Sequence, residues 1–295
     1  GLKGPGEPGR VRRRRVFSIA LPVGLNALLG NLMGAVNAAL VPQKLVEGGM
    51  DPSQAISELG VVCGMTLPML ALPTVFLSAM SLVLVPRLAR STALNRPQAV
   101  RDTISKALSA VSVLALPAMG MMAVLGEELG VLLFRQEAVG EYLLPLAAAT
   151  ALSCYQAILG ASLNGVGRQG TVAWISLVCD GVQLAFTACL VGVPSVGMGG
   201  FVAGMLVSTA LGLVLCAWRL RAFTGLSFRL FRWVTAPGLA ALLSALVTNL
   251  LFQVLRDSGV PVLWRIPGAL VFGLVLYIAA LSAQGVPLRG LFRLE

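Results

Sequence analysis

Long apolar stretches alternate with short polar connections along the whole chain. Each stretch is long enough for a helix that crosses the hydrocarbon core of a bilayer, which takes about 20 residues. The connections contain Gly, Pro and charged residues, as in EGGMDPSQ at 47–54 and RSTALNRPQ at 90–98. The apolar stretches are 16–42, 60–86, 103–125, 141–163, 171–191, 196–220, 233–254 and 264–284. The pattern predicts an all-α membrane protein with about eight transmembrane helices.

Composition supports the same fold class. Hydrophobic residues make up 57% of the chain and charged residues only 12%, about half the charged share of an ordinary soluble domain. A single soluble core of 295 residues could not bury that much apolar surface, so lipid must surround much of the chain. The net charge of +10 does not indicate nucleic-acid binding, because the basic residues cluster at the ends of the apolar stretches.

The positions of Lys and Arg predict the topology. If the N-terminus is cytoplasmic and the spans alternate, 18 of the 22 basic residues fall on the cytoplasmic side. The basic residues on the opposite side are Lys44, Arg135, Arg256 and Arg265. Positively charged loops are retained in the cytoplasm. We therefore expect a multi-pass protein of the cytoplasmic (inner) membrane with both termini in the cytoplasm.

Residue usage argues against an enzyme, a metal centre and a disulfide framework. The chain contains no histidine, which is the commonest general base and metal ligand. Its five cysteines lie within apolar stretches and form no C-x-x-C pair, so buried free thiols are expected. No motif indicates an organic cofactor.

The first residues form a separate predicted segment. The stretch GLKGPGEPGRVRRRR at 1–15 is polar and basic, and it precedes a run too long for a signal peptide. We interpret 1–15 as a cytoplasmic linker, which suggests that the chain continues a longer protein. A complete protein recorded without its initial Met is the alternative.

Four passages resemble a known family. They are LVPQKLVEGG at 40–49, GVVCGMTLPMLALPTVFLSAMSLVLVPRLARS at 60–91, LPAMGMMAVLGEELGVLLF at 116–134 and LAAATALSCYQAILGASLNGVGRQG at 146–170. In order and spacing they are similar to the stage V sporulation protein B group. That group belongs to the multidrug/oligosaccharidyl-lipid/polysaccharide flippase superfamily. The resemblance covers 16–220 well, and the last two spans by number and spacing only.

The resemblance implies an architecture and an activity. Family members have fourteen helices in two lobes, so 16–220 would be the six-helix C-terminal lobe and 221–295 an interfacial segment with two additional helices. An N-terminal lobe outside this chain would be its partner. The implied activity is translocation of a lipid-linked oligosaccharide or cell-wall (peptidoglycan) precursor by alternating access, without covalent chemistry.

Asp180 is the strongest candidate for a functional residue. It is the only ionisable residue near the middle of a span, where a carboxylate is costly and usually functional. Ser176, Asp180 and Gln183 share one helical face and predict a polar stripe directed at a cavity. Asp180 could couple transport to H+ or Na+, and a hydrogen-bonded packing role is the alternative.

Two other spans carry polar residues on one face. Gln156 and Asn164 form such a stripe in the fourth span, and Asn26 and Asn37 in the first. Amides at this spacing often join helices, so packing competes here with a cavity-lining role. For Asn26 the cavity-lining role rests on the resemblance, because the first helix of each lobe faces the cavity in that family.

The remaining candidates are prolines and basic residues. Prolines within the spans remove a backbone hydrogen bond and can act as hinges; the hinge candidates are Pro68, Pro73 and Pro117. A lipid pyrophosphate would require cations, and the weak candidates are Arg87, Lys106 and Arg168. Anchoring at the cytoplasmic surface is the interpretation that the positive-inside pattern favours for all three. The segment RLRAFTGLSFRLFRW at 219–233 is expected to contact anionic headgroups.

Two alternative functions remain open from the sequence. A cation-coupled multidrug antiporter of the same superfamily would make direct use of Asp180. A non-transporting membrane scaffold, or a half-protein inactive alone, would need none of these residues.

Overall fold

The computed structural model describes residues 9–226 and 234–284; within these ranges the side chains of 9–23, 26, 72, 73 and 263 are not described. The described residues form helices and no strand, and 88% of them are helical. Eight helical stretches in these ranges are long and apolar enough to cross a membrane. The expectation of an all-α membrane protein with about eight transmembrane helices is therefore confirmed.

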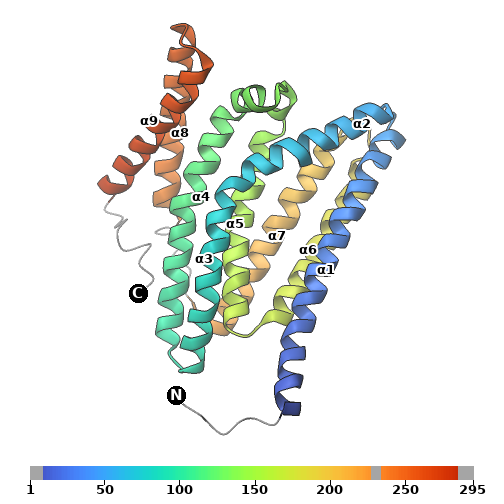
Figure 1. Ribbon diagram of the computed structural model, residues 1–295, viewed down its shortest axis with the longest axis vertical. Coiled ribbons are helices and arrows are strands. Elements are labelled where there is room, and N and C mark those ends of the chain that lie inside the picture. The colour runs from blue at the N-terminus through green and yellow to red at the C-terminus, as the bar shows by residue number, and fades with distance from the viewer. Residues whose placement is uncertain (1–8, 227–233, 285–295) are drawn as a thin grey trace.

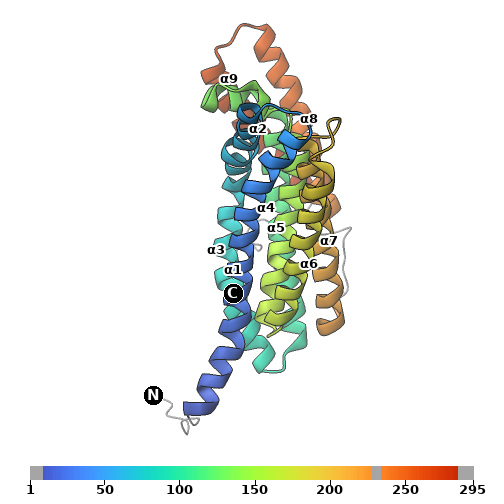
Figure 2. The same cartoon turned by 90° about the vertical axis from the view of Figure 1, so that its right-hand side faces the viewer.

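The first helix is longer than the apolar pattern predicts. Helix α1 (Gly9–Glu47) has 39 residues, or roughly 58 Å, about twice the hydrocarbon thickness. It begins within the segment expected to be a linker, because arginine is a good helix former and continues the helix beyond the apolar residues. In Figure 2 its start extends past the ends of the neighbouring helices. Residues 1–8 of that segment lie outside the described residues.

A tight turn connects α1 to the second helical segment of the bundle. The Asp51 side chain caps α2 (Pro52–Leu59) by accepting hydrogen bonds from the Ser53 hydroxyl and from the Ser53 backbone N–H, at 3.0 Å for the latter. These two bonds hold the pKa of the Asp51 carboxyl below its usual value, and the bond from the Ser53 hydroxyl has the larger effect. The turn itself uses Gly49, whose φ of +97° favours glycine.

Helix α2 continues without interruption into a π-helical turn, η1 (Gly60–Thr66), and then into α3 (Leu67–Ala93). The π turn comes just before Pro68, which has no N–H for the Gly64 carbonyl. Figure 1 shows this continuous run passing across one end of the bundle and turning down beside α4 and α5. Two of the eight apolar stretches, Pro52–Ala71 and Thr74–Ala93, belong to this run, and α1 is not among the eight.

The remaining helices alternate in direction (Figure 1). They are α4 (Pro97–Phe134), the short η2 (Glu137–Val139), α5 (Leu143–Gly165), α6 (Gln169–Leu190), α7 (Met198–Thr224), α8 (Ala236–Asp257) and α9 (Val262–Ala283). The predicted order of eight spans is matched if the continuous run 52–93 is counted as one span, together with α1 and the six helices α4 to α9. The turn between α5 and α6 is short because Gly167 adopts a φ of +82°.

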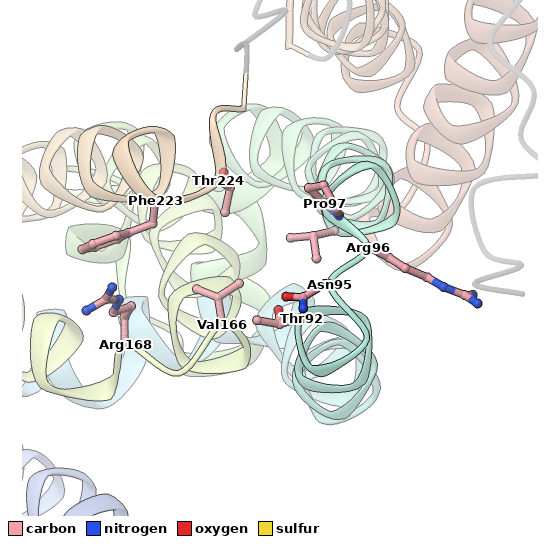
Figure 3. Close-up of a pocket in the computed structure, with 9 residues that line it drawn as sticks. Thr92, Asn95, Arg96, Pro97, Val166, Arg168, Phe223 and Thr224 are labelled. Atoms are coloured by element: carbon pink, nitrogen blue, oxygen red, sulfur yellow. The ribbon is translucent and has the colours of Figure 1, made fainter.

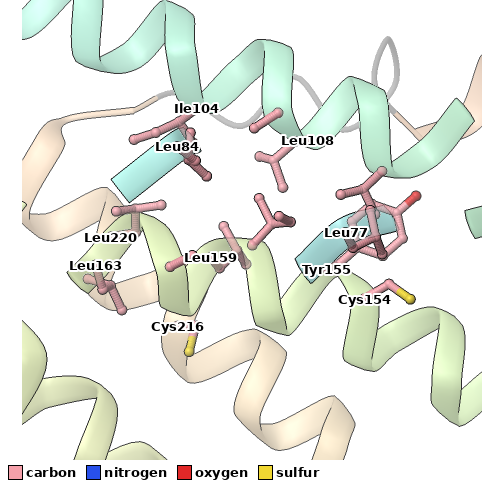
Figure 4. Close-up of a cluster of buried hydrophobic side chains, with 14 of the residues drawn as sticks. Leu77, Leu84, Ile104, Leu108, Cys154, Tyr155, Leu159, Leu163, Cys216 and Leu220 are labelled. Atoms are coloured by element: carbon pink, nitrogen blue, oxygen red, sulfur yellow. The ribbon is translucent and has the colours of Figure 1, made fainter. Parts of the chain in front are cut away.

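Helix α5 is the centre of the bundle. It packs against α3, α4 and α7, and α6 lies between α7 and α1. Figure 4 shows the largest core cluster, in which Leu84, Ile104, Leu159 and Leu163 are almost fully buried between α3, α4 and α5. The Tyr155 hydroxyl donates to Ser112 Oγ at 2.8 Å and joins α5 to α4 inside this cluster.

The last two helices pack as a pair against α4. Ser244 Oγ of α8 donates to the Gly273 carbonyl of α9 at 2.6 Å, which holds the pair together. Among the described residues, the packing thus separates α8 and α9 from the helices around α5. Residues 227–233, part of the segment expected to lie at the membrane surface, are outside the description.

Large apolar side chains cover the outer surface. Leu82 is 78% exposed and Phe76 69% exposed, both on α3, and α8 and α9 carry similar side chains. Patches of this kind face lipid in a membrane protein. Helix alternation places the turns 94–96 and 166–168 at one end, which we call the basic end. The turns 48–51 and 135–142 lie at the other, the acidic end.

Candidate functional site: a polar cavity and groove between the helices

A polar cavity of about 260 Å3, which is open on one side, lies between α1, α5, α6 and α7. Four of the residues singled out in the sequence line it: Asn37, Gln156, Asp180 and Gln183. The other lining residues are Cys179, Phe201, Met205, Ser208 and Thr209. The structure therefore brings three separate predicted stripes into one place.

Gln183 joins α6 to α7 through both groups of its amide. Its Nε2 donates to the Phe201 carbonyl at 3.2 Å, and its Oε1 accepts from Ser208 Oγ at 3.2 Å. Both groups therefore have protein partners. Gln183 thus forms a structural wall of the cavity, and one N–H and one lone pair of its amide remain for a ligand.

Asp180 differs from Gln183 in having no such partner. No hydrogen bond or ion pair to its carboxylate is found among the described residues, although the side chain is half-buried and lines the cavity. It lies eleven residues into α6, roughly 16 Å from the basic end of that helix. A carboxylate at this depth is costly unless water, a proton or a cation compensates it.

Thr187 connects the cavity to α1. Its Oγ1 lies 3.3 Å from Asn37 Oδ1, to which it donates, and 3.0 Å from the Gln183 carbonyl. Thr187 is fully buried. Asn37 thus has a packing contact as well as a place in the cavity wall. The Asn26 side chain lies outside the described residues.

Gln156 also lines a second, larger space, which we call the α3–α6 groove. This groove has a volume of about 660 Å3 and lies between α3, α5 and α6. Its polar lining residues are Ser81, Ser153, Gln156, Asn164 and Ser176. Ser176 and Asn164 are therefore separated from Asp180, and Gln156 is the residue common to both spaces.

Sequence reasoning missed the contribution of α7. Ser208, Thr209 and the Phe201 carbonyl complete the cavity. Gly212 is equally important, because a Cβ at this position would overlap the Gln156 amide and lie 2.9 Å from Cys179 Sγ. The small residues of α7 at 204, 208 and 212 recur every four residues, a spacing that indicates close helix contact.

Arg168 lines a polar pocket of about 490 Å3 at the basic end (Figure 3). Its guanidinium carbon lies 4.1 Å from the centre of the Phe223 ring, a cation–π contact. Thr92 and Asn95 form the opposite wall, while the Arg96 side chain points away from the pocket.

The other two cations predicted for a headgroup lie elsewhere. Arg87 is half-buried and Lys106 exposed, and neither lines the polar cavity, the α3–α6 groove or the pocket beside Arg168. The structure does not bring the three basic candidates together.

The prolines occupy different settings. Pro68 is exposed beside the π turn of η1, where a local change of helix geometry is available. Pro117 is buried inside α4 and leaves the Val113 carbonyl without a helical partner; Tyr277 Oη of α9 donates to that carbonyl at 3.1 Å. The Pro73 side chain lies outside the described residues.

Cysteine exposure corrects one expectation. Cys154, Cys179 and Cys216 are buried as expected, but Cys63 and Cys189 are exposed. Apolar character could not separate the two groups, because lipid accepts a thiol as readily as a protein core does. Within the described residues no cluster of three acidic or Cys side chains could hold a metal ion.

Comparisons with known proteins give no further assignment. No protein-family model matches the chain, and no curated protein matches it.

Proposed function

We propose that the chain translocates a lipid-linked oligosaccharide or cell-wall precursor across the cytoplasmic membrane by alternating access, without covalent chemistry. The observation that carries this proposal is the pair of spaces that meet at Gln156, the polar cavity and the α3–α6 groove. Together they line the interior of the bundle with hydroxyl, amide and carboxylate groups. Such groups suit a saccharide, which needs many neutral hydrogen-bond partners.

The depth of these polar groups supports a path rather than a surface feature. Asn164 lies at the basic end of α5, and Gln183 lies roughly 21 Å into α6 from the same end. The hydrocarbon core is about 30 Å thick, so polar groups extend through more than half of it. Polar residues at such depth line cavities or pathways in membrane proteins.

The proposal assigns Asp180 to ion coupling. Its carboxylate, which has no partner among the described residues, would take up H+ or Na+ in the cavity, with hydroxyl and amide oxygens of the cavity as neighbours. Binding of a cation there would favour one conformation of the bundle and so drive the transport cycle.

Arg168 is the basic candidate best placed for a headgroup phosphate, three residues after α5 ends and on the same turn as Val166. The basic end would face the cytoplasm, and the chain would work with an N-terminal lobe as its partner. The bend at η1 and Pro68 would provide a hinge.

A cation-coupled multidrug antiporter is the second candidate, and the isolated carboxylate of Asp180 is the observation that favours it. In proteoliposomes containing the complete gene product, a fluorescent lipid-linked saccharide should move between leaflets. Ion-driven drug uptake without lipid movement would favour the antiporter instead. Absence of both activities would favour a non-transporting scaffold.

A further inference from the structure

A second groove, the α6–α7 groove, lies on the outer surface at the basic end. Its volume is about 660 Å3, and it is formed by one face of α6 and one face of α7. Arg168 and Arg219 contribute the cations of this groove, while Trp174, Ile175, Leu215 and Trp218 contribute apolar surface. None of the described residues that line it is acidic.

Both guanidinium groups are held by aromatic rings. Arg168 stacks on Phe223 at 4.1 Å, and Arg219 stacks on Trp218 at 4.7 Å between guanidinium carbon and ring centre. A stacked guanidinium keeps its N–H groups free at its edge. Neither arginine forms an ion pair within the described residues, so both positive charges remain available to an anion.

The apolar part of the groove runs inward from the two cations. Val178 lies ten residues from Arg168, or roughly 15 Å along α6, and Leu215 lies four residues from Arg219, or roughly 6 Å along α7. The groove therefore accommodates the headgroup and the first part of an acyl chain within one leaflet of the ~30 Å hydrocarbon core. Trp174 is 67% exposed and Trp218 58% exposed, as expected for tryptophans at the headgroup level.

We propose that the α6–α7 groove binds an anionic phospholipid of the leaflet at the basic end. The headgroup phosphate lies between Arg168 and Arg219, and one acyl chain lies along Ile175 and Leu215. Charge complementarity selects an anionic over a zwitterionic lipid, because the groove supplies two cations and no carboxylate. Ile175 also lines the α3–α6 groove and Arg168 the pocket beside Phe223. The proposal concerns a resident lipid, and lipid binding is measured without transport, so its failure is distinguishable from failure of the proposed transport activity.

Tryptophan quenching tests the site directly. The chain has four tryptophans, and the variant Trp174→Phe/Trp233→Phe/Trp264→Phe retains Trp218 in the groove. In nanodiscs of phosphatidylcholine, a small fraction of brominated phosphatidylglycerol should quench Trp218 far more than the same fraction of brominated phosphatidylcholine. Added inorganic phosphate should not relieve this quenching. Relief by phosphate would overturn the proposal in favour of a site for the free anion.

Charge variants distinguish a site from a basic surface. Arg168→Gln/Arg219→Gln should weaken the preference for phosphatidylglycerol by roughly thirtyfold, or about 2 kcal/mol, to which the two arginines contribute equally. The matched control Arg90→Gln/Arg221→Gln removes the same charge from exposed positions at the same end, outside the groove. An equal loss in the two variants would contradict a built site.

A filling variant tests whether the lipid occupies the groove. A Cβ at Gly170, which lines the groove, meets no atom within 4 Å, so Gly170→Leu should fill the space without disturbing α6. It should reduce quenching by brominated acyl chains. Gly181→Leu, on the same helix and equally open, is the control because it lies outside the groove. Unchanged quenching in Gly170→Leu, or equal reduction in both variants, would overturn the proposal.

Discussion

Tyr277 of α9 donates its hydroxyl hydrogen bond to the Val113 carbonyl of α4, at 3.1 Å. This carbonyl is the one that would accept from residue 117 in a regular helix, and residue 117 is proline. Tyr277 is 2% exposed, so water does not replace the missing bond. The relationship gives Pro117 a role in docking α9 onto α4. Its role as a hinge stays a prediction.

The variant Tyr277→Phe should therefore lower the free energy of unfolding by about 1 kcal/mol, because it leaves a buried carbonyl without a partner. Unfolding in detergent micelles measures the change. In a Pro117→Ala background, where residue 117 can donate to Val113 again, the cost of Tyr277→Phe should largely disappear. If Tyr277→Phe lowers the free energy of unfolding equally in both backgrounds, the hydrogen bond from Tyr277 does not compensate for the proline.

Gly212→Ala should impair transport with a small effect on stability. The new methyl group would overlap the Gln156 amide, and the flexible end of that side chain would move away from the junction of the two polar spaces. We expect a loss of about 1 kcal/mol, at the low end for an overpacked site. Gly199→Ala on the same helix is the control, since its Cβ meets no atom within 4 Å. If Gly212→Ala transports at the rate of the control, Gln156 does not belong to the transport path.

Two arginines that approach the same carboxylate should differ in their effect on stability. Arg265 and Arg256 lie 4.0 Å and 3.9 Å from Glu128 Oε1, but their side chains are 10% and 68% exposed. Arg265 also donates to the Val260 carbonyl and lies over Phe252 at 5.3 Å. Arg265→Gln should cost about 1–3 kcal/mol of unfolding free energy, and Arg256→Gln below about 1 kcal/mol.

Thermal unfolding of the two variants measures this difference. Since Arg265 belongs to α9 and Glu128 to α4, the loss should loosen the α8–α9 pair first. Equal melting temperatures for Arg265→Gln and Arg256→Gln would contradict a special role for the buried arginine.

Labelling from opposite sides of the membrane tests the orientation of the basic end. In a cysteine-free background, Gln54→Cys at the acidic end should react with an impermeant thiol reagent from outside the cell. Leu94→Cys at the basic end should react only after the membrane is opened. Both positions are exposed. Reaction of the two cysteines from the same side would be incompatible with the run 52–93 crossing the membrane.

The sequence predicted the spans well because apolar length is decided by the thickness of the bilayer. It also predicted the α5 and α6 polar stripes, since helical periodicity places Ser176, Asp180 and Gln183 on one face. The sequence could not predict that Asp180 and Gln183 line the polar cavity while Ser176 lines the α3–α6 groove. That separation depends on where α7 and α3 pack, which is a property of the tertiary structure.

Other features depend on backbone geometry that residue types do not encode. The Phe201 carbonyl accepts from Gln183, yet any residue at 201 would present a carbonyl. The π turn at Gly60–Thr66 likewise follows from how the run 52–93 accommodates Pro68 while packing on the bundle. Helix α1 continues through Arg12 to Arg15 because a helix does not end where the hydrocarbon does.

The most direct test of the proposed transport path is the rate of lipid-linked saccharide movement in proteoliposomes containing Asp180→Asn. The amide keeps the size of the carboxylate but can neither release a proton nor balance a cation, so we predict that transport stops while folding and membrane insertion persist. Transport at the unsubstituted rate would contradict the account.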